Sequence, residues 1–388
     1  MLYFYTRKYL TSIVIDFDRY SLIRIVDFSN LLFSIFNSII FVTFFIYKNV
    51  VVKMMKMYLL LVFCFIIASS LKAQENQNEF KPSANPVVLV FANYHAGFGS
   101  RNDLSGFEIN RAYLGYLFQL SPNLNAKVVI DAAVAPEESF MISQKKETHI
   151  KNAQLTWADK GFTINGGMIG VLQFRLQEKF WEHRYVEKTF QDLYGMGSSA
   201  DLGVSVEYNF TPRYTIDLSM TNGEGYKNLN MNNKYRYALG MTFCPQKDLS
   251  FRIYGDIFQH TLEGKNQRTL AFFAGYKCDY FSLGTEYNYQ ENNRFLSDMD
   301  YFGYSIFTTI PFQKKWNLIG RYDNIESKNV DNKSWINYTG SMVIAGIEYI
   351  PMKNLRFALN YRHIKYLNAE SSAFGIYNSG YLNVEFLW

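Results

Sequence analysis

Residues 234–258 read KYRYALGMTFCPQKDLSFRIYGDIF, a stretch in which apolar and polar side chains alternate on both sides of a short turn, Pro245-Gln246-Lys247. The apolar set is Tyr235, Tyr237, Leu239, Met241 and Phe243 before the turn, and Leu249, Phe251, Ile253 and Ile257 after it. Successive side chains of a β-strand point to opposite faces, so this alternation predicts two antiparallel strands that share one apolar face.

The same two-residue rhythm continues from residue 85 to the C-terminus and predicts sixteen strands. Their expected ranges are 87–98, 106–119, 125–135, 148–158, 162–173, 201–210, 213–221, 234–243, 249–258, 268–277, 280–290, 301–311, 315–324, 338–350, 354–366 and 375–388. Every second connection is short, as in Ser121-Pro122-Asn123, whereas others, such as 221–233 and 325–337, are long and polar. This asymmetry is typical of bacterial outer-membrane barrels, whose turns are periplasmic and whose loops are external. The predicted fold class is all-β, a closed transmembrane antiparallel β-barrel of about 16 strands, because a sheet in lipid cannot leave an edge unpaired.

Composition supports this fold class and excludes one function class. Aromatic residues make up 18% of the chain, with 30 Tyr and 34 Phe, which suits strands with a lipid-facing side and aromatic girdles. The formal charge of +5 comes entirely from residues 1–73, which hold eight Lys and Arg but three Asp and Glu, whereas residues 74–388 hold 31 of each. A neutral barrel gives no support to a nucleic-acid-binding function.

The cysteines do not indicate a metal site. Cys64 lies in a segment that we expect to be removed, and Cys244 and Cys278 lie near predicted strand ends with a whole strand between them. That separation favours two free thiols over a disulfide. The sequence contains no CxxC motif and no Cys/His spacing typical of metal ligands, so no metal and no cofactor are expected.

The first 84 residues are expected to precede the barrel domain, 85–388. Residues 54–73 have a basic start, an apolar run and a small final residue, which predicts a secretory signal peptide cleaved near Ala73. Residues 1–53 include an apolar run at 30–47 that is long enough for a transmembrane helix. We interpret 1–53 as an over-extension of the true start. Residues 74–84 are polar and are predicted to be a flexible lead-in.

The last predicted strand ends the chain on an aromatic residue, and Leu382, Val384, Phe386 and Trp388 share its apolar face. This ending resembles the C-terminal sorting signal of outer-membrane barrels. The resemblance implies that the barrel assembly machinery recognises Trp388 and that the protein resides in the outer membrane of a Gram-negative cell.

Four stretches resemble the phosphate-selective porin O/P-like family of outer-membrane porins: GFEINRAYL at 106–114, SPNL at 121–124, ADLGV at 200–204 and TNGEG at 221–225. The resemblance covers roughly residues 85–388. It implies a porin that allows passive diffusion of small hydrophilic solutes, with phosphate-like anions among them. The implied partners are outer-membrane lipid, these solutes and, as is common among porins of this size, further copies of the chain in a homotrimer.

One long segment, 174–200, interrupts the strand rhythm after the fifth predicted strand. In sixteen-stranded porins the connection at this place folds inward and narrows the pore, so we expect a constriction loop, with an external flap as the alternative. Its pore-lining candidates are Arg175, Glu178, Lys179, Glu182, Arg184, Glu187 and Lys188, each of which could equally sit in a structural salt bridge. Four basic and four acidic side chains in this segment favour selection by size over selection for phosphate.

Parity turns further charged side chains of the predicted strands towards the lumen. The basic ones are Lys127, Arg236, Arg252, Arg321, Arg356 and Arg362, and the acidic ones are Asp131, Asp201, Glu207, Asp217, Asp256, Glu286, Asp323, Glu348 and Glu385. Charged rings set ion preference, but pairs such as Arg321 and Asp323 could instead only hydrate and cross-link the lumen. Overall neutrality predicts weak selectivity unless the bases gather on one side. In 106–119, Glu108 and Arg111 fall on opposite faces, which indicates a β-bulge or a position near the periplasmic end.

Two other function classes are weighed against the porin. An enzyme would need a histidine beside a nucleophile or carboxylate. The five histidines (His95, His149, His183, His260 and His363) fall in separate strands or loops, and neither GxSxG nor HExxH occurs, so no enzyme is predicted. A non-conducting outer-membrane barrel that acts as a binding or adhesion module is compatible with the long loops.

Overall fold

The computed structural model describes residues 80–98, 105–134, 146–228, 233–260, 265–328, 339–366 and 376–388. The N-terminal extension (1–53), the predicted signal peptide (54–73) and residues 74–79 of the predicted lead-in lie outside the described residues. The first strand begins at Ser83, where it pairs with Gln119, so it takes in the last two residues of the predicted lead-in.

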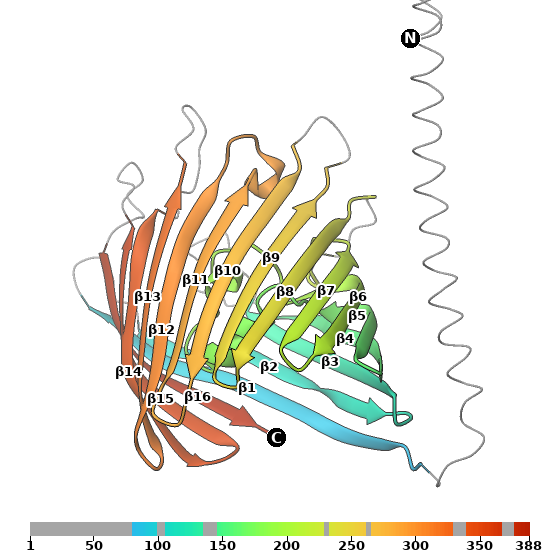
Figure 1. Cartoon of the computed structure of the whole chain (residues 1–388). Coiled ribbons are helices and arrows are strands. Elements are labelled where there is room, and N and C mark those ends of the chain that lie inside the picture. The colour runs from blue at the N-terminus through green and yellow to red at the C-terminus, as the bar shows by residue number, and fades with distance from the viewer. Residues whose placement is uncertain are drawn as a thin grey trace, which may run out of the picture. The chain divides into compact units, whose positions relative to one another are not determined.

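Sixteen strands in the described residues form one closed antiparallel sheet (Figure 1). They are β1 (Ser83–Phe98), β2 (Ser105–Gln119), β3 (Leu124–Val134), β4 (Lys146–Asp159), β5 (Phe162–Gly170), β6 (Ala200–Thr211), β7 (Tyr214–Thr221), β8 (Arg236–Gln246), β9 (Leu249–Phe258), β10 (Gln267–Lys277), β11 (Ser282–Glu291), β12 (Tyr301–Gln313), β13 (Trp316–Ser327), β14 (Gly340–Met352), β15 (Leu355–Tyr366) and β16 (Ile376–Leu387). Each strand pairs with its neighbours in sequence, and β1 pairs with β16. The predicted fold class is confirmed.

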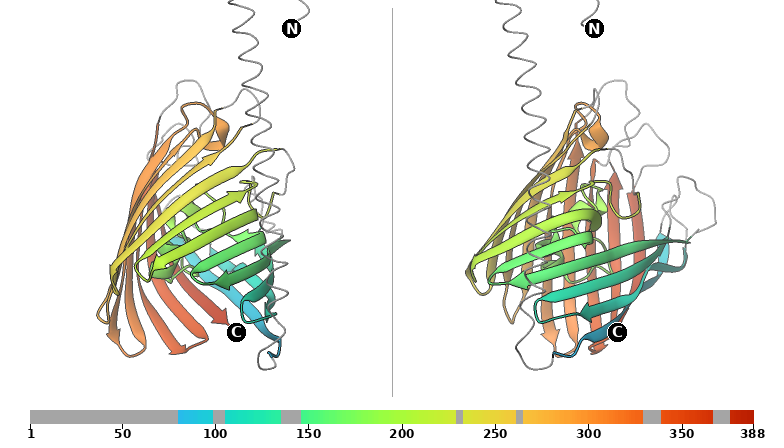
Figure 2. Two further views of the ribbon diagram at one scale, coloured as in Figure 1. Left: turned by 45° about the vertical axis from the view of Figure 1, so that its right-hand side comes forward. Right: turned by 90° about the vertical axis from the view of Figure 1, so that its right-hand side faces the viewer.

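The burial of side chains follows the predicted alternation. Leu239, Met241 and Ile253 are 42%, 47% and 51% exposed on the outer face, whereas Arg252 and Asp256 are each 5% exposed on the inner face. The apolar set therefore covers the outside of the barrel and the polar set lines its interior, as period two requires. Figure 2 shows the strands inclined to the barrel axis.

All strand ends lie within four residues of their predicted positions. The end of β5 differs from its predicted position for a reason that the structure shows. The sequence predicts a strand to residue 173, but β5 ends at Gly170. The backbone carbonyl of Leu172 accepts a hydrogen bond from Arg252 (3.0 Å), and the side-chain amide of Gln173 donates to the side-chain carbonyl of Gln191 (2.7 Å). These two residues have already turned into the lumen, so the predicted strand was too long.

A β-bulge resolves the ambiguous face of β2. The register with β1 shifts between Phe91 and Ala92, which leaves Asn110 as an extra residue. Beyond the bulge the alternation reverses, so Glu108 and Arg111 both face the lumen. Of the two alternatives left by the sequence, the bulge is confirmed.

A second bulge lies in β4. The register shifts between Val129 and Ile130 of β3, and Lys151 of β4 is the extra residue. Lys151 is buried on the inner side, where its ammonium group donates to the hydroxyl of Ser199 (2.8 Å). Strict alternation would have placed this lysine on the outer face.

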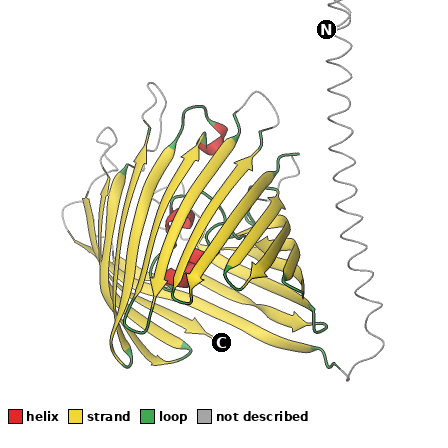
Figure 3. Cartoon of the chain, viewed as in Figure 1, coloured by secondary structure: helices red, strands yellow, loops and turns green. Residues whose placement is uncertain are grey.

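The helical segments are short. They are α3 (Arg175–Trp181), α4 (Phe190–Leu193) and the 3₁₀ turn η1 (Asn293–Phe295). Figure 3 shows α3 and α4 inside the ring of strands. No helix within the described residues is both long and apolar enough to cross a membrane.

Deletion of Asn110 tests the role of the bulge in β2. The register already passes over Asn110, so its deletion keeps Ile109 opposite Ala92 and leaves Glu108 and Arg111 on the inner face. It loses only the side-chain hydrogen bonds of Asn110 with Asn93 (2.6 Å) and Glu108 (3.3 Å). Deletion of Ala112 instead removes a paired residue, so that strict alternation from Tyr113 turns Arg111 to the apolar outer face, which costs up to about 4 kcal/mol for an arginine against lipid. We expect the urea midpoint of unfolding in lipid vesicles to fall further in the Ala112 deletion than in the Asn110 deletion. Equal loss in the two deletions would contradict this account.

Candidate pore constriction

Residues 171–199, here called the inner loop, connect β5 to β6 and fold into the barrel (Figure 3). Phe174, Trp181, Tyr185 and Phe190 are at most 2% exposed, although they belong to no strand. A positive φ of 67° at Gly195 helps the chain to turn back towards β6. The predicted inward-folded loop is confirmed, and the alternative of an external flap is wrong.

The first part of the inner loop packs on β10, β11 and β12. The ring of Phe180 lies 5.3 Å from that of Phe273, and the ring of Trp181 lies 5.4 Å from that of Phe307. Gly275 leaves room for Phe180, because a Cβ atom there would lie 2.6 Å from the phenyl ring. Burial of each ring contributes roughly 1.5–3 kcal/mol relative to exposure, so this end of the inner loop is held firmly.

The remainder of the inner loop packs on the other strands of the same half of the barrel. Phe190, Tyr194 and Met196 contact Tyr301 and Ile325, while Tyr185 and Val186 belong to a cluster with Phe91, Ile319, Met342, Ile344 and Ala358. The inner loop thus lies against the wall from β10 round to β16 and reaches β1. The wall formed by β2 and β3 lies opposite it, and β4 meets the end of the loop through the hydrogen bond from Lys151 to Ser199 (2.8 Å).

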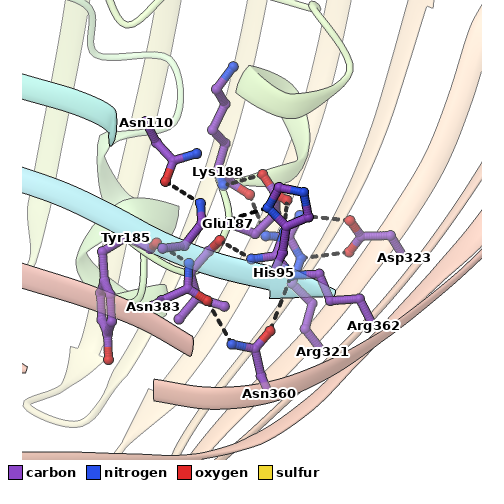
Figure 4. Close-up of polar contacts among 12 residues, drawn as sticks. His95, Asn110, Tyr185, Glu187, Lys188, Arg321, Asp323, Asn360, Arg362 and Asn383 are labelled. Carbon is purple, nitrogen blue, oxygen red and sulfur yellow. Dashed lines mark hydrogen bonds and ion pairs between the residues drawn. The ribbon is translucent and has the colours of Figure 1, made fainter. Parts of the chain in front are cut away.

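Arginines of the wall hold the backbone of the inner loop (Figure 4). Arg252 donates to the carbonyl of Leu172 at 3.0 Å and Arg362 to that of Val186 at 2.5 Å. Arg321 donates to the carbonyl of Lys188. Hydrogen bonds from a charged donor are stronger than neutral ones, so these arginines anchor the inner loop at its beginning and near its middle.

The same arginines are paired with carboxylates. Arg252 forms two hydrogen bonds with Asp217 (2.6 and 2.9 Å), and Arg321 forms two with Asp323 (2.8 and 2.7 Å). Arg362 donates to Glu187 of the inner loop (2.8 Å). Each charge is compensated next to it, so these three predicted wall bases add little free charge to the lumen.

The other predicted wall bases also lie on the inner face. Arg236 is 3.5 Å from Asp256, and Arg356 is 3.2 Å from Glu385. Lys127 forms no ion pair with any side chain that the structure describes. It is therefore the one base of the predicted set whose charge is not neutralised by a described partner.

The charged candidates on the inner loop form several ion pairs. Arg184 pairs with Glu178 (3.0 Å) and Asp192 (2.5 Å), Glu182 pairs with Lys277 (2.7 Å), and Arg175 pairs with Glu207. Lys179 and Lys188 make no ion pair among the described residues, and Lys179 is exposed. Their role as pore-lining residues stays a prediction.

Charge on the inner loop is stable to pH. Burial disfavours the charged form of Arg184, but Glu178 and Asp192 outweigh burial and raise the pKa of its guanidinium above the ordinary value. Burial likewise acts to raise the pKa of Asp192, but Arg184 and Lys188 lower it below its usual range. Both groups therefore keep their charge over the pH range in which cells live.

The wall that faces this part of the inner loop carries residues that the sequence did not identify. Arg111 donates to Asp131 (2.9 Å), and the hydroxyl of Tyr226 donates to the same carboxylate (2.6 Å). Lys151 lies over the ring of Tyr226, 5.1 Å from its centre. Lys151 and Arg111 are close enough to Arg184 and Asp192 for their charges to interact.

Two features of the chain explain why the sequence did not identify Arg111, Lys151 and Tyr226 as residues of the lumen. The bulges that turn Arg111 and Lys151 inward leave no mark in the alternation itself. Tyr226 lies in the connection after β7, which was read only as an external loop. Positive φ angles at Gly223 (88°) and Gly225 (80°) bend this connection inward, and two closely spaced glycines before an aromatic residue are a signal that the sequence does contain.

Cys244 and Cys278 are free thiols, with β9 between the strands that they follow or occupy. In the part of the chain that the structure describes, no three His, Cys, Asp or Glu side chains are grouped to hold a metal ion.

No protein-family model matches the sequence, and neither does any curated protein sequence. Solved structures match in fold. The outer membrane channel DcaP of Acinetobacter baumannii is 13% identical, and the match covers 81% of this chain and 99% of that chain with a TM-score of 0.59. The outer membrane protein OmpT of Vibrio cholerae in its trimer form is 11% identical, with 80% and 100% covered and a TM-score of 0.55. An anion-selective porin from Comamonas acidovorans is 10% identical, with 79% and 100% covered and a TM-score of 0.59.

The fold is that of the outer-membrane porins. Identities this low show the fold alone. The resemblance to the phosphate-selective family therefore stays a prediction.

Substitution of Gly275 tests the packing of the inner loop. Gly275→Ala places a methyl group 2.6 Å from the ring of Phe180, and such overpacking costs about 1–3 kcal/mol. We expect a lower midpoint of thermal unfolding in detergent. Gly320→Ala is the matched control, because the nearest atom to its Cβ is 3.6 Å away. Equal loss in both variants would show that the effect comes from the strand and not from the inner loop.

Proposed function

We propose that this chain is an outer-membrane channel through which small hydrophilic solutes diffuse passively. One observation carries the proposal: the inner loop folds into the interior of a closed barrel, and the side chains of Glu178, Arg184 and Lys188 on it are only half-buried. The similarity in fold to an outer membrane channel and an anion-selective porin supports it.

Solutes would pass between the inner loop and the wall of β2, β3 and β4. The inner loop is packed mainly against the opposite half of the barrel. Arg111, Tyr113 and Lys151 lie on this wall, and Lys151 would bound the passage through its hydrogen bond to Ser199 at the end of the loop. Passage then depends on the width left by the inner loop and on the charges along it. The mechanism needs no cofactor and no catalytic group, and no enzyme activity is proposed.

We further infer a preference for anions, with phosphate-like ions as the family-implied class. Lys127, Lys151 and Lys188 form no ion pair with described side chains, whereas the nearby acids Asp131 and Asp192 are each bound to an arginine. The acids and bases of the chain are nearly equal in number. Of the inward groups without a described ion pair, the acids Asp201 and Glu286 are only 3% and 2% exposed, whereas Lys127 and Lys188 are half-exposed. Local surplus charge of one sign attracts the opposite ion over short distances.

The proposed setting is the outer membrane, reached after cleavage of the signal peptide near Ala73. The apolar outer face would contact lipid, and the barrel assembly machinery would read the C-terminal strand that ends at Trp388. A homotrimer is proposed as well, supported by the trimer form of OmpT.

A second candidate is a non-conducting barrel that serves as a binding or adhesion module. The number of anchors between the inner loop and the wall favours it, because a loop held on so many strands resembles a plug. Absence of any open-channel current would favour this function over the channel.

Removal of residues 178–188 tests whether the inner loop narrows a pore. The full-length protein should conduct in a planar lipid bilayer, and the deletion should raise its single-channel conductance because a segment that occupies the interior of the barrel is gone. The fraction of folded barrel, measured by gel mobility before and after heating, controls for assembly. Unchanged conductance in a folded deletion variant would mean that this segment does not line the pathway.

Replacement of the three unpaired lysines tests the anion preference. The triple variant Lys127→Gln, Lys151→Gln and Lys188→Gln should shift the reversal potential in a potassium chloride gradient towards that of a cation-permeable channel. Lys160→Gln changes the same charge in the exposed turn after β4 and should leave the reversal potential in place. The same reversal potential in the triple variant and the unaltered protein would refute the preference.

A further inference from the structure

His183 occupies a buried position between two oxygen acceptors. It is 1% exposed and lies in the inner loop directly after α3 and its C-cap residue Glu182. Its Nδ1 donates to the carbonyl of Trp181 (2.5 Å), and its Nε2 lies 3.3 Å from an oxygen of Glu348 on β14. Neither a carbonyl nor a carboxylate oxygen can donate a proton.

This arrangement requires a proton on both ring nitrogens. A neutral imidazole carries only one, so its other nitrogen would direct a lone pair at an oxygen of Trp181 or Glu348. The imidazolium places a proton and no lone pair beside each oxygen: Nδ1 donates to Trp181, and Nε2 forms a close ion pair with Glu348 that lacks the geometry of a hydrogen bond. The geometry therefore assigns the charged form to His183 when the inner loop is in its observed position.

The charges around His183 agree with this assignment. Glu348 is 1% exposed, and its second oxygen is 3.9 Å from Arg356, which also pairs with Glu385 at 3.2 Å. With a charged His183, two bases face two acids. With a neutral His183, one carboxylate in this buried group has no counter-charge, which is costly away from water.

The remaining groups near His183 do not supply that charge. Tyr185 and Asn317 donate neutral hydrogen bonds to Glu348, at 2.9 and 2.5 Å. The two nearby acids of the inner loop do not compete for His183, because each has its own base: Glu182 pairs with Lys277, and Glu187 pairs with Arg362.

Glu348 thus receives two side chains of the inner loop, His183 and Tyr185, at the point where the loop crosses from β12 to β16. On one side Trp181 packs on Phe307, and on the other Asn383 donates to the carbonyl of Tyr185 (3.1 Å; Figure 4). Of the two side chains in contact with Glu348, only His183 carries a basic group, so only its contact changes from an ion pair to a neutral contact when a proton is lost.

We propose that His183 is a positioning residue that, as an imidazolium, latches the inner loop to Glu348, so that loss of its proton loosens the loop and makes the passage unsteady. The stabilisation is present while His183 is protonated and is lost as the pH rises. The effect on current rests on the proposed channel function, whereas the latch itself does not.

The first test is the current through the full-length protein in a planar bilayer, recorded from about pH 5 to about pH 9, a range that spans the ordinary titration of histidine. Brief closures should become more frequent as the pH rises. His183→Gln should show frequent closures at every pH, because an amide keeps the shape but cannot take up the charge. A variant with the pH profile of the unaltered protein would overturn the proposal.

Tyr185→Phe is the matched control. It removes the neutral hydrogen bond to the same carboxylate and leaves the titrating group in place. It should raise the number of closures but keep their dependence on pH. Loss of the pH dependence in Tyr185→Phe would show that any weakening of the contact has this effect, and the specific role of the imidazolium would be wrong.

Fluorescence separates the latch from the channel. The rings of Trp181 and His183 lie 5.2 Å apart, and a protonated imidazole at this distance quenches indole emission. The emission should rise with pH in the unaltered protein and stay constant in His183→Gln. If no current flows but this titration is present, the channel function fails and the latch stands. If current flows and neither signal depends on His183, the latch fails and the channel stands.

Discussion

Closure of the sheet is the constraint on which the rest of the structure depends. Val88 and Trp388 exchange backbone hydrogen bonds of 2.9 and 2.8 Å, and with this pairing of β1 and β16 no strand edge is left free. A closed wall has an inside and an outside, and the two-residue alternation then assigns each side chain to one of them. Only within such a wall can one loop find partners on β10 to β16 and on β1.

The inner loop takes the place that a hydrophobic core has in a soluble domain. The largest fully buried side chains are Trp181, Tyr185, Phe174 and Phe190, and all four belong to it. The wall around it is polar. Arginines of this wall donate hydrogen bonds to backbone carbonyls of the inner loop, and each planar guanidinium group binds a carboxylate and a carbonyl together. Lys127 of the wall and Lys188 of the inner loop, by contrast, form no described ion pair.

The sequence allowed the wall to be predicted far better than the constriction. Alternation was enough to turn Arg252, Arg321 and Arg362 inward, and counting strands placed the inner loop. Alternation cannot register a bulge, because one extra residue changes no residue type, so Lys151 was missed and Arg111 was left open. The task of each inward arginine could not be read either. Whether a guanidinium faces water or a loop carbonyl depends on contacts between residues more than a hundred positions apart, such as Arg362 and Val186.

The anchoring of the inner loop also sets an order of events in time. The hydrogen-bond donor to the carbonyl of Tyr185 is Asn383, 198 residues later in the chain. The acceptor for its hydroxyl is Glu348, 163 residues later. Contacts so distant in sequence form late, since the intervening chain must first be brought together. During assembly the unfinished barrel therefore carries a loop whose large aromatic side chains have no cover, and the final strands that close the sheet also shield that loop.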